Sequence, residues 1–368
     1  EGGSGQSGPA GPRGAVGSAR GPEVMSSPPL VACPSPGSCH RATCSTSESC
    51  YRSPPCVQVR HSAGSGMDEI RKFSTGRMPL ESLSQLEDRV HLSGATKVGQ
   101  GGFSDVLRTT DRVTGKHVAV KVLSMQHNGQ DERRLRHEVR VMSEFRHPNV
   151  VELVAVVVGN RSLPSVRGKP PYLCIITGYV DNHEPLSQPI RRMGSLPSLA
   201  VRVLPQLAGA LAAMHSQGLV HRDVWSENVL VDQAGHAVLV DLGCAEYASE
   251  KAVHSQQLNM PYMSPEAALH QRQHPKDDAW SLGLLLTEIV TGTFVGDRLK
   301  RTDLPIHQVP ALLVEAVAMT LTAGGSFLGR LAVRLLHLRA TCRLSCQELF
   351  EELSGWGGGG GGGSSPPP

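Results

Sequence analysis

The sequence predicts an α+β fold of two lobes, a small strand-rich N-terminal lobe with one helix and a larger helical C-terminal lobe. Three observations predict it. Short β-type runs fill most of residues 95–180, one amphipathic segment interrupts them at 132–147, and helical periodicity prevails after Tyr179. We expect the functional site in the cleft between the two lobes.

The chain of 368 residues divides into four parts by composition. Residues 1–66 are rich in Gly, Ser and Pro and carry almost no large apolar side chains, so we expect a disordered low-complexity tail. Residues 67–91 are expected to form a linker with a short helix at 79–89. Residues 92–354 have the apolar density of a folded domain, and 355–368 are expected to be a second disordered tail.

The charge is nearly balanced, with 36 Lys and Arg against 33 Asp and Glu. Because the basic residues do not cluster, we expect no nucleic-acid partner. No apolar run approaches the length of a membrane span, and the first residues do not resemble a secretory signal. We therefore expect an intracellular, cytoplasmic protein without a membrane span, with Met25 and Met67 as candidate start residues.

Nine cysteines divide unevenly along the chain. Five fall between Cys33 and Cys56, which fits either a metal or redox cluster or compositional bias in an unfolded tail. Their spacing is wider than in most zinc sites and His40 is the only histidine among them, so we favour compositional bias. The other four are scattered, as expected for reduced intracellular thiols.

The predicted N-terminal lobe begins with a strand–turn–strand at 95–111 and continues with strands at 114–125, 150–159 and 172–180. Before the strand at 150–159, apolar residues recur at steps of three and four, which predicts the amphipathic helix. These apolar residues are Leu135, Val139, Met142 and Phe145.

The predicted C-terminal lobe starts with one long helix at 199–218, which contains Pro205 and ends at a glycine. Two short strands at 228–232 and 237–241 follow, joined by a turn. The remaining chain predicts further helices at 264–271, 278–292, 310–323 and 346–355.

A glycine-rich turn, Gly99–Val106, lies between the first two predicted strands. Glycines at such a tip let backbone N–H groups approach phosphate oxygens closely. An ordinary hairpin is the simpler interpretation of this motif taken alone. A dinucleotide-binding fingerprint would continue into a helix, whereas a second strand follows here, so that class of site is disfavoured.

Lys121 occupies the interior of an apolar strand. An unpaired ammonium there is costly, so it requires a carboxylate partner or an anionic ligand. Glu138, on the polar side of the predicted helix, is the natural candidate. The alternative is a surface lysine whose charged end reaches solvent.

The most specific pattern is His221-Arg222-Asp223 with Asn228, followed eighteen residues after Asp223 by Asp241-Leu242-Gly243. Phosphoryl transfer needs a carboxylate to orient the attacking hydroxyl and accept its proton, which suits Asp223. It also needs hard oxygen ligands for magnesium, which suits Asn228 and Asp241.

With these motifs the sequence resembles the eukaryotic protein kinase family over residues 92–353, the serine/threonine type more than the tyrosine type. The resemblance implies the two-lobed kinase fold, MgATP as cofactor and protein substrates. It implies catalytic roles for Lys121, Glu138, Asp223, Asn228 and Asp241.

The same resemblance implies an ATP site. Thr177 would stand at the back of the adenine pocket as the gatekeeper, followed by the hinge at 178–180. The residues implied to bind ATP are Val98, Gly99, Gly101, Phe103, Val106, Ala119, Lys121, Thr177, Tyr179, Val180 and Leu230. By the same resemblance Asp278 would be structural, and Arg343 would pair with Glu266 of the SPE motif.

The chain departs from the family pattern at several positions. Leu242 replaces the Phe of the D-F-G motif, and Trp225 stands where serine/threonine kinases carry a Lys that faces the γ-phosphate. Asn259 replaces a Thr, and the pair before Arg343 reads Arg339-Ala340 instead of Asp-Pro. These departures concern rate and specificity, since no essential ligand is lost.

Two alternatives to an active protein kinase remain at this point. The first is a pseudokinase that binds ATP or acts as a scaffold, although such proteins usually lose Lys121, Asp223 or Asp241. The second is a small-molecule kinase, which the SPE motif disfavours. Glu227 before Asn228 favours serine/threonine over tyrosine specificity.

Arg222 needs an anion because it directly precedes the catalytic Asp223. We predict that a phosphate on Ser255 of the activation segment, residues 241–266, supplies it by charge-assisted hydrogen bonds. The alternative is that Glu246 or Glu250 already neutralises Arg222, with Ser255 an ordinary loop residue.

Overall fold

The computed structural model describes part of the chain. The described residues are 80–82, 90–91, 94–100, 104–124, 129–159, 163, 166–169, 172–249, 260–269, 274–296 and 327–357. The predicted disordered tail at 1–66, most of the linker, the helix at 310–323 and Ser255 lie outside them. So do Gly101 and Phe103 of the predicted ATP site.

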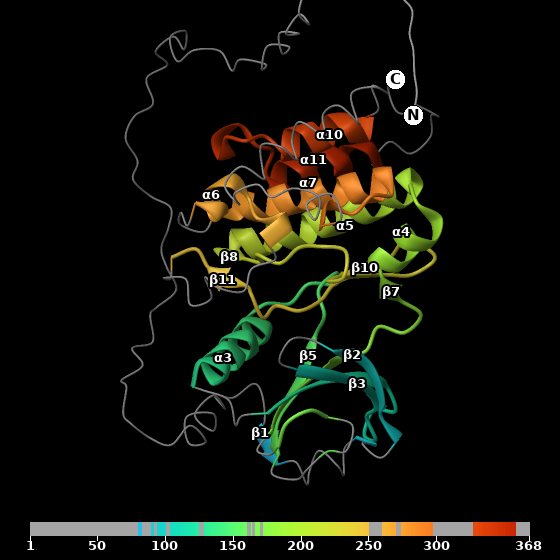
Figure 1. Cartoon of the computed structure of the whole chain (residues 1–368), viewed down its shortest axis with the longest axis vertical. Helices are drawn as coiled ribbons and strands as arrows, with labels where there is room; N and C mark the ends of the chain where they lie inside the picture. Colours follow the sequence, from blue (N-terminus) through green and yellow to red (C-terminus); the bar gives the residue numbers. More distant parts are fainter. Residues whose placement is uncertain are drawn as a thin grey trace, which may run out of the picture. The chain divides into compact units, whose positions relative to one another are not determined.

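A six-stranded sheet forms the N-terminal lobe (Figure 1). Its strand order is β1-β5-β6-β4-β3-β2, and all neighbours are antiparallel except β1 and β5. The helix α3, Gly129–Glu144, packs against β5. The strands are β1 Leu80–Ser82, β2 Thr96–Gln100, β3 Ser104–Thr110, β4 His117–Ser124, β5 Leu153–Gly159 and β6 Tyr172–Gly178.

The short helix predicted at 79–89 is wrong where the structure describes it. Leu80–Ser82 is a strand that pairs in parallel with residues 156–158 of β5. The helical pattern of this segment is a local preference, and the free edge of β5 offers backbone hydrogen bonds that override it. Residues 83–89 lie outside the described ranges.

The two faces of this sheet differ in burial. Alternate residues of β3 and β4, such as Leu107, Val118 and Val120, are buried in an apolar cluster. The residues between them, including Val106 and Lys121, are only half-buried. Because side chains alternate between the faces of a strand, one face forms the core of the lobe and the other is left for a ligand.

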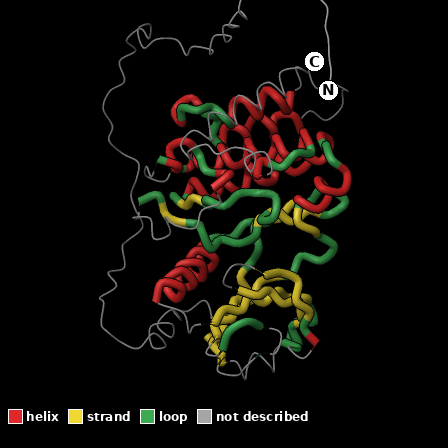
Figure 2. The backbone as a smooth tube through the Cα atoms, viewed as in Figure 1, coloured by secondary structure: helices red, strands yellow, loops and turns green. Residues whose placement is uncertain are grey.

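Helices dominate the C-terminal lobe, and Figure 2 shows their separation from the strands of the N-terminal lobe. The two-lobed α+β prediction is therefore confirmed. Two of these helices, α4 and α10, were not predicted. The helices are α4 Ser187–Met193, α5 Pro197–Ser216, α6 Pro265–Ala268, α7 Pro275–Thr291, α10 Phe327–Leu335 and α11 Cys346–Gly357. The last continues beyond 354, where the folded domain was predicted to end.

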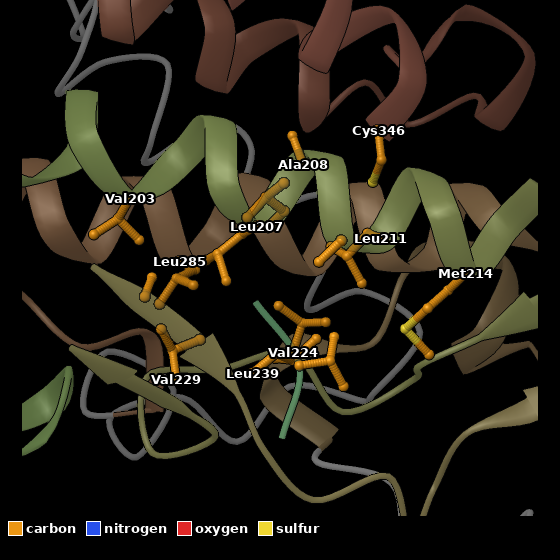
Figure 3. Close-up of a cluster of buried hydrophobic side chains, with 14 of the residues drawn as sticks. Val203, Leu207, Ala208, Leu211, Met214, Val224, Val229, Leu239, Leu285 and Cys346 are labelled. Carbon is orange, nitrogen blue, oxygen red and sulfur yellow. The ribbon is translucent and has the colours of Figure 1, made fainter. Parts of the chain in front are cut away.

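The core of this lobe is built around α5, which passes through Pro205 without ending (Figure 3). Val203, Leu207 and Leu211 of α5 are almost fully buried and belong to one cluster with Leu285 of α7. Their burial offsets the roughly 3 kcal/mol that an interior proline costs a helix. Within the part of the chain described here, α5 is also the one helix long and apolar enough to cross a membrane, but it is mostly buried in this core.

Two small sheets hold the loops that face the N-terminal lobe. One has the order β10-β9-β7, from Ala237–Leu239, Val229–Val231 and Glu184–Pro185. The other pairs β11, Glu246–Tyr247, with β8, Leu219–Val220. The segments that contain Asp223 and Asp241 therefore begin and end in paired strands.

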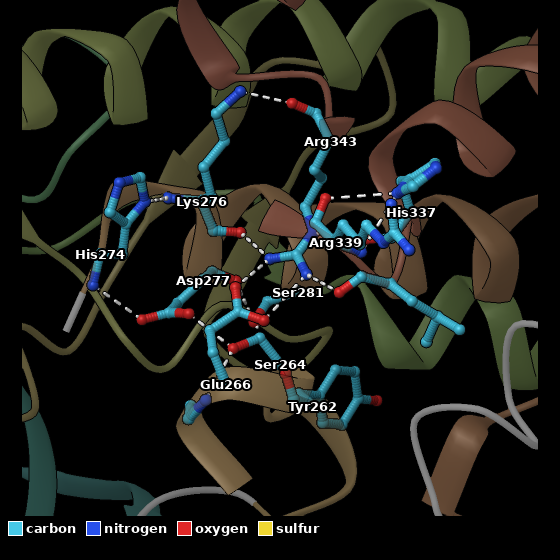
Figure 4. A network of polar contacts seen from close by, with 12 residues as sticks. Tyr262, Ser264, Glu266, His274, Lys276, Asp277, Ser281, His337, Arg339 and Arg343 are labelled. Carbon is cyan, nitrogen blue, oxygen red and sulfur yellow. Dashed lines mark hydrogen bonds and ion pairs between the residues drawn. The ribbon is translucent and has the colours of Figure 1, made fainter. Parts of the chain in front are cut away.

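A polar network fixes the end of the activation segment on the helical lobe (Figure 4). The guanidinium of Arg343 is fully buried and donates to both carboxylate oxygens of Glu266, at 2.5 and 3.0 Å. It also donates to the carbonyl of Lys276 at 2.8 Å and lies 5.0 Å from the ring centre of Trp280. The predicted pairing of Glu266 with Arg343 is confirmed.

Glu288 anchors the same segment from α7 and should make stability depend on pH. It is fully buried and accepts hydrogen bonds from the Tyr262 hydroxyl and from the Val295 N–H. Burial raises the pKa of Glu288 from 4.5 to about 7. The folded state therefore holds this proton more tightly than the unfolded state. The stability that this difference contributes is fully present below pH 4.5 and is lost as the pH rises from 4.5 through about 7.

We expect Glu288→Gln to remove this dependence. Between pH 5 and pH 8 the free energy of unfolding should fall on the order of 2–3 kcal/mol further in the wild type than in the variant. Denaturant unfolding across this range measures the difference. Asp277, whose pKa burial also raises to about 6, is present in both proteins and cancels. Parallel pH curves for the two proteins would contradict the assignment.

Candidate active site

Lys121 joins two carboxylates from different parts of the chain. Its Nζ lies 2.7 Å from Oε1 of Glu138 on α3 and 3.0 Å from Oδ1 of Asp241. Burial disfavours its charged form, but Asp241 and Glu138 outweigh that effect and raise the pKa of Lys121 above its ordinary value. The predicted Lys121–Glu138 pair is confirmed, and the ammonium stays charged at neutral pH.

Glu138 itself is 5% exposed. Burial raises its pKa above the ordinary value although Lys121 lies next to it. A carboxylate in this environment depends on its cation, because an unpaired buried charge costs several kcal/mol. The position of α3 and the orientation of Lys121 are therefore coupled.

Asp223 and Asn228 form a second pair. The amide nitrogen of Asn228 donates to Oδ2 of Asp223 at 2.8 Å and to its backbone carbonyl at 2.9 Å. Burial and the nearby Asp241 raise the pKa of Asp223 to about 6. A carboxylate with this pKa is ionised at neutral pH and is a better proton acceptor than an exposed one.

The two pairs are connected through the backbone, where the N–H of Val240 donates to the carbonyl of Asn228 at 2.9 Å. Asp241 follows in a left-handed conformation, with φ of 60°, and its Oδ1 accepts the N–H of Gly243 at 3.1 Å. Lys121 lowers the pKa of Asp241, so this carboxylate is ionised. The turn directs it toward Lys121.

Asp278 fixes the backbone of the loop that carries Asp223. Its buried carboxylate accepts the backbone N–H groups of His221 and Arg222 at 2.8 and 2.7 Å, and it lies 2.8 Å from His215 Nε2. Arg222 has a φ of 69°, a conformation that costs a non-glycine residue about 1 kcal/mol or more. These hydrogen bonds stabilise that conformation, which agrees with the structural role implied for Asp278.

Arg222 is neutralised by Glu246 of β11. Its Nη1 lies 2.6 Å from Oε2 of Glu246, and both side chains are buried. This is the alternative that the sequence left open, a carboxylate of the chain itself in place of a phosphate. Ser255 lies outside the described residues, so its phosphorylation stays a prediction.

We expect Glu246→Gln to destabilise the domain by about 3 kcal/mol, because it leaves the guanidinium of Arg222 buried without its counter-charge. Chemical denaturation measures the change. The exposed Arg146–Glu152 pair provides a matched control, since Glu152→Gln should change stability by less than about 1 kcal/mol. Equal stability of the two variants would show that Arg222 does not depend on Glu246.

The predicted nucleotide-binding residues lie on the half-buried face of the sheet. Val106 is in register with Lys121, and Ala119 is in register with Thr177 of β6. Gly99 lies opposite Val106, and a Cβ added to it would contact the Val106 side chain at 3.4 Å.

The other described residues of the predicted ATP site come from β2, from the segment after β6 and from β9. Tyr179 and Val180 follow β6 directly, and Val98 on β2 is 48% exposed. Leu230 lies half-buried in β9 of the C-terminal lobe.

The donor set fits magnesium and a triphosphate. Asp241 is ionised, and the two hydrogen bonds of the Asn228 amide nitrogen leave its oxygen as a ligand. Lys121 supplies a fixed positive charge beside them. Asn228 and Asp241 would hold the metal, and Lys121 would hold phosphate oxygens.

Two supporting contacts were not anticipated from the sequence. His137 on α3 lies 2.6 Å, through Nε2, from the carbonyl of Ala245, which ties this helix to the activation segment. Trp225 packs against Tyr262 with ring centres 6.0 Å apart, so its bulk supports the segment that leads to the SPE motif. Neither contact has a local signal, because the partners are far apart in sequence.

Comparison with known proteins agrees with this geometry. The family model described as "Protein kinase domain" matches residues 92–353. The chain is 31% identical over 212 residues to serine/threonine-protein kinase PAK mbt of Drosophila melanogaster, which covers 57% of this chain and 31% of that protein. It is also 31% identical over 210 residues to the hormonally up-regulated neu tumor-associated kinase of Homo sapiens, covering 55% of this chain. The two matches span 31% and 28% of the relatives' own lengths, less than a third in each case.

Proposed function

The chain belongs to the protein kinase family, and we propose that it transfers the γ-phosphate of MgATP to serine and threonine hydroxyls of protein substrates. The observation that carries this proposal is the convergence of five residues in two connected groups, Lys121 with Glu138 and Asp241, and Asp223 with Asn228. Each of these residue types matches one requirement of phosphoryl transfer.

The geometry supports one role for each of these residues. Lys121, held by Glu138 and Asp241, positions phosphate oxygens, and Asp223 orients the attacking hydroxyl and accepts its proton. Asn228 and Asp241 hold magnesium, which when bound neutralises charge on the transferring group. Because Asn228 also donates to Asp223, the metal site and the base are kept in fixed relation.

The pseudokinase alternative gains no support from the structure. The three residues that such proteins usually lose are present, and Lys121 forms with Glu138 of α3 the ion pair that phosphotransfer in protein kinases needs. Serine/threonine specificity is supported by the name of the relative PAK mbt and by Glu227 before Asn228. Protein substrates are supported by the anchored SPE segment, through Glu266 and Arg343.

An intracellular, cytoplasmic location is part of this proposal. It rests on the four described cysteines, all of which are free thiols. Cys174 and Cys346 are fully buried, and burial raises the pKa of Cys174 to about 12, so this thiol is unreactive.

A radiolabelled ATP assay on a mixed peptide library tests the activity and the acceptor residue together. We expect label on Ser and Thr peptides, dependent on magnesium and absent with Asp223→Asn. Label on Tyr peptides alone would overturn the specificity. No transfer by a preparation that binds MgATP would favour the pseudokinase.

A further inference from the structure

His183, Asp232 and His236 converge at one end of the small sheet β10-β9-β7. One nitrogen of each histidine and one carboxylate oxygen of Asp232 all lie within 4.8 Å of one another. We propose that these three side chains form a zinc-binding site, separate from the magnesium site of the proposed phosphotransfer.

The register of the sheet brings them together. Glu184 of β7 and Ala237 of β10 both pair with Val231 of the central strand β9. Antiparallel pairing continued by one residue sets His183 and His236 on either side of Asp232. The tight turn 232–236 completes the arrangement, with the N–H of His236 donating to Oδ1 of Asp232 at 2.8 Å. The cluster is therefore built by backbone pairing and needs little reorganisation to bind an ion.

A backbone contact fixes the tautomer of His183 in the form that can bind a metal ion through Nε2. Its Nδ1 lies 2.8 Å from the carbonyl oxygen of Asp181, which can only accept, so Nδ1 carries the hydrogen. In the neutral ring Nε2 then carries a lone pair, and it points to Nδ1 of His236 at 3.1 Å. Metal-bound histidines are commonly oriented by this kind of carbonyl contact.

The spacing and donor types suit zinc. Two nitrogens about 2.05 Å from a tetrahedral zinc ion are about 3.3 Å apart. This is close to the 3.1 Å between Nε2 of His183 and Nδ1 of His236. Two imidazoles and one carboxylate are ordinary zinc ligands, and three protein ligands leave a fourth position for water. Magnesium and calcium disfavour this set, because they prefer oxygen ligands.

The location gives the site a structural consequence. Asp181, whose carbonyl orients His183, also lies 2.6 Å from Nδ1 of His117 and 3.2 Å from Nη2 of Arg108 through its carboxylate. These two residues belong to β4 and β3. A bound ion would therefore connect the segment after β6, which contains Asp181 and His183, to the turn between β9 and β10. Through Asp181 the same segment contacts the N-terminal lobe.

Zinc titration of the full chain, after removal of metal with a chelator, tests the proposal. Because the N-terminal cysteines can also bind zinc, the comparison is between variants. The double variant His183→Gln/His236→Gln should bind one zinc ion fewer per chain than the wild type, and His91→Gln, at an exposed histidine elsewhere, should match the wild type.

Asp232→Asn gives an independent test, because Asn still accepts the N–H of His236 and preserves the turn. Loss of a residue that only hydrogen-bonds to a metal ligand weakens metal binding roughly 10- to 100-fold. Loss of Asp232, a direct ligand, should therefore weaken zinc binding at least about tenfold. Zinc, but not magnesium, should raise the melting temperature of the wild type more than that of either variant. Equal zinc stoichiometry, affinity and melting shift in the wild type and the double variant would overturn the proposal. In that case the 3.1 Å contact is a hydrogen bond between two histidines.

Discussion

Lys121→Met is expected to reduce phosphotransfer more than about 100-fold, which corresponds to about 2.7 kcal/mol of transition-state stabilisation. Lys121 lies between Glu138 and Asp241, at 2.7 and 3.0 Å, so its removal leaves phosphate oxygens without a cation and the two carboxylates without their link. Initial rates with a serine peptide and saturating MgATP measure the loss.

The fold should survive this substitution. Methionine fills a similar volume in β4, and Glu138, whose pKa is already raised by burial, can take up a proton when its cation is removed. Circular dichroism and thermal unfolding check this point. Lys116→Met, at an exposed lysine in the turn before β4, is the control and should keep full activity. Turnover of Lys121→Met above about a tenth of the wild type would contradict the assigned role.

Most contacts within the candidate active site could be predicted because phosphoryl transfer constrains short stretches of sequence. Asp223 and Asn228 are five residues apart and pair directly, as the motif implies. Lys121 and Glu138 were paired correctly because a buried lysine needs an anion and the next helix offers one. In both cases the required partner lies in the same motif or on the next predicted helix, so the sequence indicates it.

Features that depend on register or on distant partners were harder to predict. Glu246 reaches Arg222 because β11 pairs with β8, a contact that composition cannot rank above Glu250 or a phosphate. The cluster of His183 with Asp232 and His236 likewise arises from three paired strands. Cross-strand neighbours have no fixed sequence spacing, so no motif marks them.

The missed helices had different causes. In α10 the buried residues Leu328, Leu331 and Leu335 recur at helical spacing, so a signal was available there. In α4, Pro189 lies in the first turn, where a helix tolerates proline although the residue usually indicates a break.

Asp223→Asn and Asp241→Asn are expected to abolish turnover for different reasons, and nucleotide binding separates them. Asp223 is placed as the proton acceptor, so its amide variant should lose more than about 100-fold in rate while it binds MgATP as the wild type does. Asp241 is placed as a metal ligand and as the second partner of Lys121. Its amide variant should lose the rate and also the dependence of nucleotide affinity on magnesium.

Calorimetric titration with ATP, with and without magnesium, measures this difference for all three proteins. The wild type and Asp223→Asn should bind more tightly when magnesium is present, whereas Asp241→Asn should give nearly the same affinity in both conditions. The distinction follows from the structure, because Asp223 contacts Asn228 and makes no bond to Lys121, while Asp241 contacts Lys121 at 3.0 Å. If the two variants gave identical titrations, the assignment of one carboxylate to the base and the other to the metal would be wrong.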